Sequence, residues 1–237
     1  MARLPRLSVS GLPHLVLQAG HNGQAVFLDA VDRAAYRSAL KSAAAETGVR
    51  VHAYSLDSGR VLLLVTPAQA QGLSRMMQRV GRVYTAAFNR RHLRSGTIWA
   101  GRFRATVIDP DSGLVDAMRH VEAEAARADD AAAPPAERIS SLAHHLGLEN
   151  DALVSDHPLF WALGNTPFER HAAYRALVNQ PLPAERRLRF DDAVQKGWAV
   201  GPEAFLDRLS GTGVRRVRPL APGRPRRSAG RKESVPN

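Results

Sequence analysis

The stretch HAYSLDSGRVLLLVTP, residues 52–67, decides the fold, because it reads as two strands joined by a tight turn. Apolar residues run through both halves, and the polar trio Asp57, Ser58 and Gly59 lies between them. Two apolar runs separated by a short segment of turn-forming residues are typical of a β-hairpin. We therefore predict strands over residues 49–56 and 60–66.

The segments on either side of this hairpin predict a small α+β domain. The expected elements are a strand at 12–18, helices at 29–47, 69–91 and 111–128, and a strand within 96–109. Asp29 is a suitable residue to cap the first helix, and Gly48 is a suitable residue to end it. The order strand, helix, strand, strand, helix, strand, helix predicts a ferredoxin-like βαββαβ sandwich with an appended helix.

The remaining sequence divides the chain into three predicted parts. Residues 1–128 form the ferredoxin-like domain, and the low-complexity stretch ADDAAAPPAE at 128–137 marks its end. Residues 129–210 predict a small helical C-terminal region, with helical patterns at 138–147, 157–164, 166–178, 184–196 and 202–209. The basic tail, 211–237, is rich in proline, glycine and arginine, and we expect it to be disordered in isolation.

Composition favours a polyanionic partner over a membrane or a redox role. The chain has 237 residues, a formal net charge of +11 and a sequence pI of about 11.1. Such an excess of cations indicates nucleic acid as the simplest partner. Cysteine is absent, which excludes disulfides and thiolate chemistry. No apolar run approaches the ~20 residues of a membrane helix, so we expect a cytoplasmic, nucleoid-associated protein.

The helix expected at 69–91 has an apolar side and a basic side. Apolar residues recur at helical spacing, from Leu73 to Phe88, and five arginines lie largely off that stripe. No acidic residue occurs between positions 72 and 91. The pattern fits either a merely solvated face or a surface that meets phosphates.

Many short motifs, in order along the chain, resemble the REP-associated tyrosine transposases, relatives of the single-tyrosine His-hydrophobic-His (HUH) transposases. The motifs are MARLPRL (1–7), GLPH (11–14), HAY (52–54), LLVTP (63–67), LSRMMQ (73–78), YTAAFNRR (84–91), SGTIW (95–99), GRFR (101–104), HPL (157–159), ALG (162–164), RHAAYRALV (170–178) and GRPRR (223–227). The resemblance implies a ferredoxin-like nuclease domain that binds hairpin-forming single-stranded DNA with palindromic repeats. It also implies a divalent ion, Mg²⁺ or Mn²⁺, that polarises a phosphate, and a tyrosine that attacks it.

The residues that would carry this chemistry are replaced in the present chain. The family pattern Pro-Asn-His-X-His-Leu-Leu corresponds here to residues 58–64, so Arg60 and Leu62 stand at the metal histidines. His120 stands at the tyrosine. Guanidinium and leucine cannot ligate a cation. We therefore expect no intact catalytic residue, no metal site and no cofactor, and a transposase-like protein that binds DNA without cutting it.

Three alternatives stay open. His120 could act as a nucleophile, or ligate a metal with His14 or His52, in an active nickase with a rearranged site. Arg60 could replace the lost ion's charge against a DNA phosphate, or its presence could reflect drift. The chain could also be a decayed protein-interaction module with no nucleic-acid role.

The expected DNA contacts are mostly arginines. We predict that DNA phosphates contact Arg75, Arg79, Arg82, Arg90, Arg91, Arg94, Arg102 and Arg104. The tail arginines Arg224, Arg226 and Arg227 are expected either to enter a minor groove or to follow the backbone. Trp99 and Phe103 are expected either to stack on unpaired bases or to pack in the core. The resemblance further implies a homodimer as the working unit.

Overall fold

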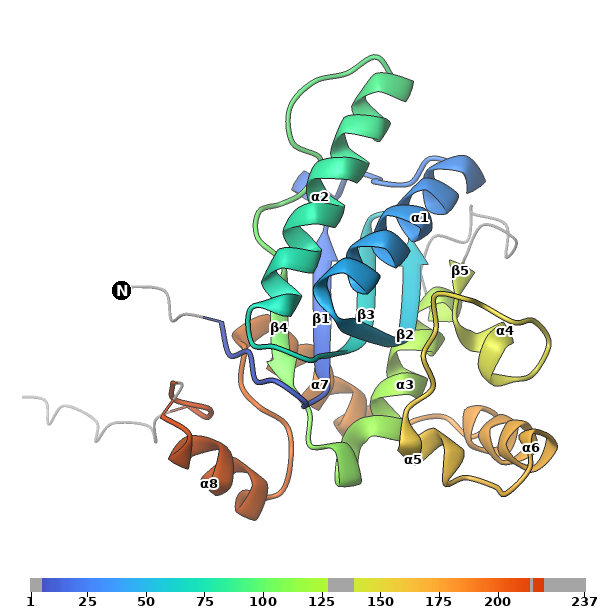
Figure 1. The fold of residues 1–237 in the computed structure, drawn as a ribbon, viewed down its shortest axis with the longest axis vertical. Helices are drawn as coiled ribbons and strands as arrows, with labels where there is room; N and C mark the ends of the chain where they lie inside the picture. Colours follow the sequence, from blue (N-terminus) through green and yellow to red (C-terminus); the bar gives the residue numbers. More distant parts are fainter. Residues whose placement is uncertain (1–5, 128–138, 214, 220–237) are drawn as a thin grey trace, which may run out of the picture.

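The computed structural model describes residues 6–127, 139–213 and 215–219 (Figure 1). The strands are β1 (His14–Ala19), β2 (Val49–Asp57), β3 (Arg60–Pro67), β4 (Arg104–Val107) and β5 (Ile139–Ser140). The helices are α1 (Ala30–Thr47), α2 (Gly72–Arg91), α3 (Pro110–Arg127), α4 (Leu142–His145), α5 (Pro158–Trp161), α6 (Pro167–Val178), α7 (Ala184–Lys196) and α8 (Glu203–Gly211). A single 3-10 turn, η1 (His21–Gly23), follows β1.

One antiparallel sheet organises the described residues, with strand order β4-β1-β3-β2-β5. The first four strands have the order 4-1-3-2, which is that of a ferredoxin-like sandwich, so the predicted fold class is confirmed. The opening hairpin is β2–β3, and its register pairs Asp57 with Arg60 across the turn. β3 therefore lies in the middle of the sheet, flanked by β1 and β2.

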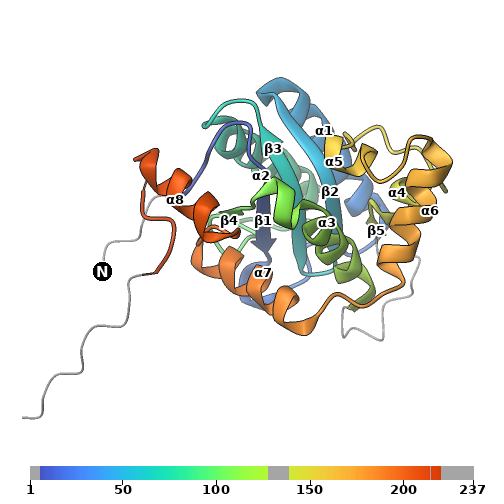
Figure 2. The ribbon, with the colours of Figure 1, turned by 90° about the horizontal axis from the view of Figure 1, so that it is seen from below.

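Helices cover both faces of the sheet, which explains the unbroken apolar run in β3. Figure 2 shows α1 and α2 on one side and α3 and α7 on the other. Val61, Leu63 and Val65 face the core under α1 and α2, whereas Leu62 and Leu64 face the core under α3 and α7. Strands that are buried on both faces lose the alternation of apolar and polar residues.

The core under α1 and α2 contains a cluster of aromatic rings. The rings of Phe27, Tyr36, Tyr84 and Trp99 contact one another at centroid distances of 5.2–6.1 Å. α1 begins as predicted, because the Asp29 side chain accepts a hydrogen bond from the Asp32 backbone N–H, and it ends at Gly48 with φ of 63°.

The C-terminal helices complete the second face of the sheet rather than standing apart from it. Phe160 of α5, Tyr174 of α6 and Phe190 of α7 share one buried cluster with Met118 of α3 and Leu62. α8 packs in a third cluster, with Leu7 near the N-terminus. The predicted boundary near residue 128 falls outside the described residues and stays a prediction.

The expected helix at 138–147 is wrong in its first part. Ile139 and Ser140 form β5, which pairs with Leu56 and Ser55 at the open edge of β2. Only Leu142–His145 is helical. A free strand edge offers backbone hydrogen bonds to any nearby segment, and this choice depends on a partner more than 80 residues away. Among the described helices, none is long and apolar enough to cross a membrane.

Acid is expected to weaken the fold through two buried histidines. Burial lowers the pKa of both His14 and His52 to about 4, from an ordinary value of 6.5. Between these values the unfolded chain binds protons that the folded chain does not, so stability falls as the pH drops from 6.5 towards 4. At pH 5 each histidine should lower the free energy of unfolding by about 2 kcal/mol relative to neutral pH.

Urea unfolding from pH 7.5 to 4.5 measures this loss. The variant His52→Asn should remove about half of the dependence on pH, because only His14 then contributes. The matched control is His21→Asn, since His21 is exposed. A stability that is flat between pH 6.5 and 5 would contradict the assignment.

Candidate nucleic-acid interface

Arg60 and Leu62, which we expect at the positions of the family's metal histidines, lie on one face of β3, towards α3 and α7. Leu62 is 4% exposed and belongs to the core on that face. Arg60, two residues earlier, lies at the end of the strand beside Asp57, with 3.9 Å between Nε and the carboxylate. Leu62 offers no donor atom and fills the position with apolar volume. This part of the face is therefore built as core, with one cation at its rim.

His120 lies on the same face but is closed off from solvent. Its side chain is fully buried on α3, and its Nε2 lies 3.3 Å from the Asp191 carboxylate of α7. The Phe190 ring lies 5.3 Å from the imidazole ring, centroid to centroid. α7 thus covers His120. A phosphate could reach His120 only if α7 moved.

His14 and His52 cannot join His120 in a metal site. The His14 ring hydrogen-bonds Leu12 and Val9 on the backbone and points to the other face of the sheet. The His52 ring is held between the Ser155 carbonyl and the Thr66 hydroxyl, at 2.7 and 2.9 Å. Both rings therefore form hydrogen bonds within the fold.

One histidine cluster does form among the described residues, at α4. Nitrogen atoms of His144 and His145 lie 3.2 and 3.7 Å from the same Asp156 oxygen, and no ion is present. The Asp151 N–H donates to His144 Nδ1, so His144 Nε2 carries its proton and donates it to Asp156. His144 is therefore committed to hydrogen bonding. His145 is fully buried.

All four tyrosines of the chain are buried. Tyr36, Tyr54, Tyr84 and Tyr174 are each at most 1% exposed. Three of the hydroxyls donate to protein acceptors: Tyr54 to Asp151, Tyr84 to the Val26 carbonyl and Tyr174 to Glu122. Burial raises the pKa of each hydroxyl. No tyrosine is placed to attack a phosphate from solvent.

The arginines of α2 form an exposed row on the side of the helix opposite its buried stripe. Leu73, Met76, Val80, Tyr84 and Phe88 are buried against the sheet and α1. The row comprises Arg75, Arg79, Arg82 and Arg90, all exposed. Their successive spacings of four, three and eight residues keep them on one side of a helix with 3.6 residues per turn.

Some of the predicted arginines are engaged within the protein. The two terminal nitrogens of Arg91 contact Asp29 and Asp32 on α1 at 2.5 Å, and this pairing lowers the pKa of Asp29 to about 2. Arg79 pairs with Glu46 at 2.7 Å, with both side chains about half exposed. Arg91 therefore ties α2 to α1, and its charge is offset by two carboxylates.

Trp99 and Phe103 lie in the core. They are 6% and 9% exposed, and the Arg6 guanidinium lies 3.9 Å from the centre of the Phe103 ring. Of the two alternatives, the structure favours packing over base stacking for both rings.

A cavity of about 190 Å³ lies at the end of the sheet where β1 and β4 meet α7. It is lined by Leu17, Ala19, Ala100, Gly101, Arg102, Arg104 and Gln195. The strand register places Arg60 opposite Ala19 and Leu62 opposite Leu17, so the cavity adjoins β3 beside Arg60 and Leu62. Two exposed arginines at a small cavity suit an anion. Sequence reasoning named Arg102 and Arg104 but could not place them there.

The tail arginines Arg224, Arg226 and Arg227 lie outside the described residues. The first part of the tail is described and contacts the fold. The Arg215 guanidinium donates to the Gly197 carbonyl, Val217 is buried, and Arg218 pairs with Glu203 and Asp207 of α8. Residues 215–218 therefore belong to the folded body.

The sheet order and the helices define a ferredoxin-like α+β fold. Among solved structures, the chain is similar to a REP-associated tyrosine transposase bound to a REP hairpin, with a TM-score of 0.51 and 11% identity. That match covers 66% of this chain and 99% of the other. It is also similar to a candidate transposase from Deinococcus radiodurans R1, with a TM-score of 0.35, 20% identity and coverage of 48% and 93%. No protein-family model matches the chain, and no curated protein matches it.

Proposed function

We propose that this protein is a transposase-like DNA-binding protein that recognises hairpin or single-stranded DNA and does not cleave it. The observation that supports DNA binding is the exposed arginine row of α2 on a transposase-like fold. Four cations in line on one helix face suit the regular charge of a phosphate backbone. Arg102 and Arg104 at the small cavity offer a second anion contact.

The absence of cleavage rests on the residues at the positions of the family's chemistry. Leu62 has no ligand atom, and Arg60 carries a guanidinium that cannot bind a cation. His120 and the four tyrosines are buried. A phosphotyrosine link needs a hydroxyl that can reach the phosphate in line, so none can form without unfolding. Arg60 could attract a DNA phosphate through its charge, but it cannot activate the phosphate for attack as a metal ion would.

DNA is the partner that these features support, and two further expectations remain predictions. One is a preference for the palindromic hairpins of the resembled family. The other is a homodimer. With no metal ligands at the replaced positions, we expect binding that is indifferent to Mg²⁺ beyond its general screening of charge.

Fluorescence anisotropy tests the proposal on a hairpin-bearing single strand, an unstructured strand and a duplex, over a salt series. We expect the hairpin strand to bind best and its affinity to fall steeply with salt. The same samples, run on a denaturing gel after incubation with Mg²⁺ or Mn²⁺, should show neither nicks nor a covalent adduct. Nicking that disappears in His120→Ala would overturn the inactive assignment. Absence of binding at low salt would overturn the DNA assignment.

A further inference from the structure

The end of α2 carries a leucine where the backbone favours glycine. Leu93 has φ of 50°, in the left-handed region. The Arg94 N–H donates to the Asn89 carbonyl at 3.0 Å, which is the bond that closes a helix through such a residue. α1 and α7 end on left-handed glycines, Gly48 and Gly197. α2 instead places a branched apolar side chain at this point, where a Cβ is unfavourable.

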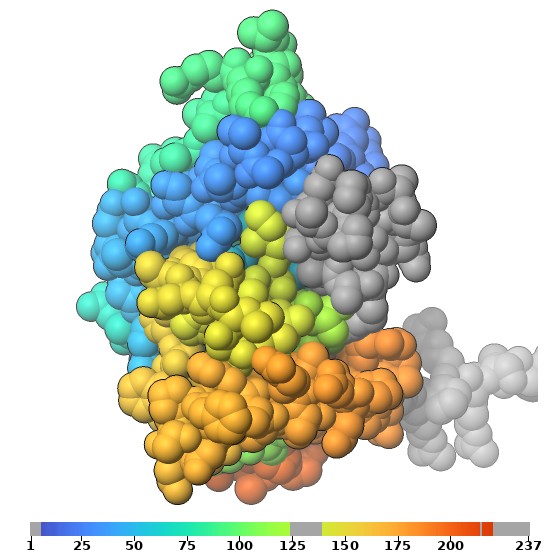
Figure 3. Space-filling model, turned by 90° about the vertical axis from the view of Figure 1, so that its right-hand side faces the viewer, coloured from blue at the N-terminus to red at the C-terminus, as the bar shows by residue number. Residues whose placement is uncertain are grey.

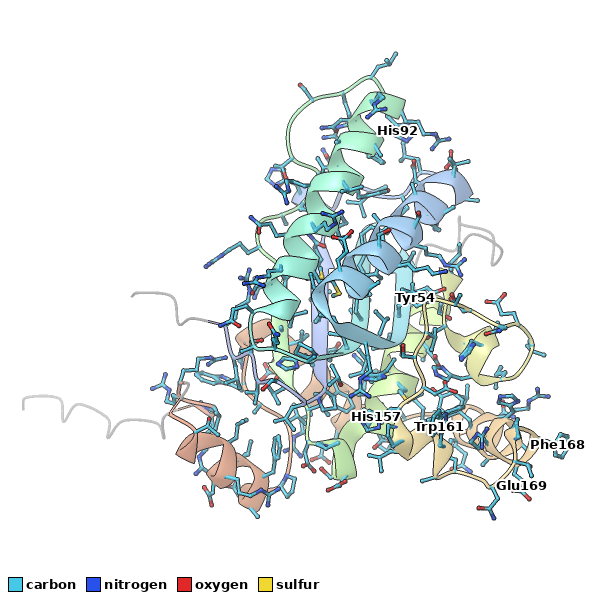
Figure 4. All side chains as sticks on the ribbon, in the orientation of Figure 1. Tyr54, His92, His157, Trp161, Phe168 and Glu169 are labelled. Atoms are coloured by element: carbon cyan, nitrogen blue, oxygen red, sulfur yellow. The ribbon has the colours of Figure 1, made fainter. Side chains whose placement is uncertain are left out.

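The same leucine is almost wholly in solvent. Leu93 is 95% exposed, the most of any large apolar side chain among the described residues. Figure 3 shows the end of α2 projecting beyond the body of the molecule, and Figure 4 places His92 at that end, far from α6. In the protein without DNA, Leu93 is unfavourable for two reasons: its apolar side chain is exposed to water, and its backbone has a left-handed conformation that disfavours a Cβ. Such departures from local preference occur at functional positions.

The residues just before Leu93 are fixed to the rest of the protein by their side chains. The Arg91 guanidinium is fixed to Asp29 and Asp32, and the His92 ring lies 4.4 Å from the Phe88 ring and within 3.0 Å of Asp32. Across the loop, the Asn89 amide donates to the Gly96 carbonyl at 2.8 Å.

Two further arginines complete the tip of α2. Arg90 and Arg94 are exposed on either side of Leu93 in the sequence. An apolar side chain between two cations is complementary to a base step between two phosphates. Proteins that kink or open nucleic acids insert apolar wedges of this kind between bases.

We propose that Leu93 is a wedge that inserts into the base stack at the junction between a hairpin stem and its single-stranded flank, with Arg90 and Arg94 on the flanking phosphates. The inference rests on the proposed DNA binding and adds how the junction is distinguished from plain duplex. At a junction the terminal base pair has lost one stacking neighbour, so opening it costs less than opening a step inside a duplex. The wedge thereby gives a preference for hairpin strands without reading their sequence.

The test uses hairpin strands with a single 2-aminopurine, placed in turn at each position from the stem end into the flank. The fluorescence of 2-aminopurine rises when its base is unstacked. Wild-type protein should raise it several-fold at one or two adjacent positions of the junction. Leu93→Gly should lose that rise and bind the hairpin strand about as weakly as an unstructured strand. Leu93→Met should retain the rise, because methionine keeps the apolar volume.

Leu93→Gly is suited to the test because it relieves the strained backbone. Its melting temperature should increase by about 2–4 °C, so lost function cannot be assigned to unfolding. The matched control is Leu148→Gly, which removes another exposed leucine from the loop after α4 and should leave the fluorescence rise unchanged.

The outcomes separate the wedge from the proposed function. Salt-sensitive hairpin binding with no rise at any position, or with an equal rise in Leu93→Gly, overturns the wedge and leaves DNA binding in place. No binding by wild-type protein at low salt overturns both. A rise that Leu93→Gly abolishes while its affinity for the unstructured strand stays at the wild-type value supports the wedge.

Discussion

Replacing Arg75, Arg82 and Arg90 together by alanine is expected to weaken hairpin binding about 100-fold at roughly 0.1 M salt. These three arginines lie exposed along α2, and none of them forms an ion pair with another described residue. If each contacts one phosphate, their loss removes about two units from the slope of log affinity against log salt, at roughly 0.7 per contact. Alanine favours helix, so α2 should persist.

The measurement is anisotropy at four or more salt concentrations, so that slope and affinity are obtained together. The control replaces Arg175, Arg208 and Arg216, which are exposed on α6, on α8 and in the segment after α8. Both variants change the net charge by the same three units. Equal losses in the two would mean that the protein attracts DNA only through its overall charge, and that α2 is not the interface.

Arg79 and Arg91 are left out of the triple variant because of their partners. Arg91 contacts Asp29 and Asp32, so its removal would leave two carboxylates near the end of α2 without their cation. Any loss of DNA binding would then mix charge repulsion with a displaced helix. Arg79 is a milder case, since its pair with Glu46 is about half exposed and contributes little to stability.

The parts of the fold that depend on neighbouring residues could be predicted from the sequence. The hairpin at 49–67 follows from two apolar runs around Asp57-Ser58-Gly59. α2 follows from apolar residues at helical spacing, and its burial pattern agrees with that stripe. In both, the signal lies within one element and repeats several times along it.

The parts of the fold that depend on residues distant in the chain could not be predicted from the sequence. β5 exists because Ile139 meets the free edge of β2, and two residues carry no periodicity to reveal it. Arg91 looks like its neighbour Arg90 in sequence, yet only Arg91 reaches Asp29 and Asp32, about 60 residues away. Which arginines remain available to DNA therefore depends on the tertiary structure.

Glu122→Ala is expected to destabilise the protein by about 3–5 kcal/mol, which corresponds to a loss of roughly 10 °C in melting temperature. Glu122 is 1% exposed on α3 and accepts hydrogen bonds from three side chains. The donors are Ser141 Oγ at 2.6 Å, His145 Nδ1 at 2.5 Å and the Tyr174 hydroxyl at 2.6 Å. Removing the carboxylate leaves His145 Nδ1 and the Tyr174 hydroxyl buried without an acceptor and leaves Ser141 Oγ only the Tyr54 carbonyl at 3.5 Å. Each buried donor that loses its acceptor costs about 1–3 kcal/mol.

This network joins α3 to the segments that follow β5 and to α6. Helix α3 also carries His120 and packs against β2 and β3. The carboxylate thus ties the second face of the sheet to its C-terminal cover. Burial and the nearby Glu122 carboxylate raise the pKa of Tyr174 well above 10, so this tyrosine serves as a neutral donor in the network and not as a nucleophile.

Differential scanning calorimetry of Glu122→Ala, Tyr174→Phe and their double variant measures the network. Tyr174→Phe removes one of three donors and should cost about 1–1.5 kcal/mol. The double variant should cost less than the sum of the two single losses, because alanine at 122 leaves the Tyr174 hydroxyl without a partner in the first place. Glu149→Ala, an exposed acid beyond α4, is the control and should change the melting temperature by less than 2 °C. If Glu122→Ala proved no more damaging than Glu149→Ala, the carboxylate would not hold α3 to α4 and α6, and the role of Tyr174 as a neutral donor in this network would be contradicted.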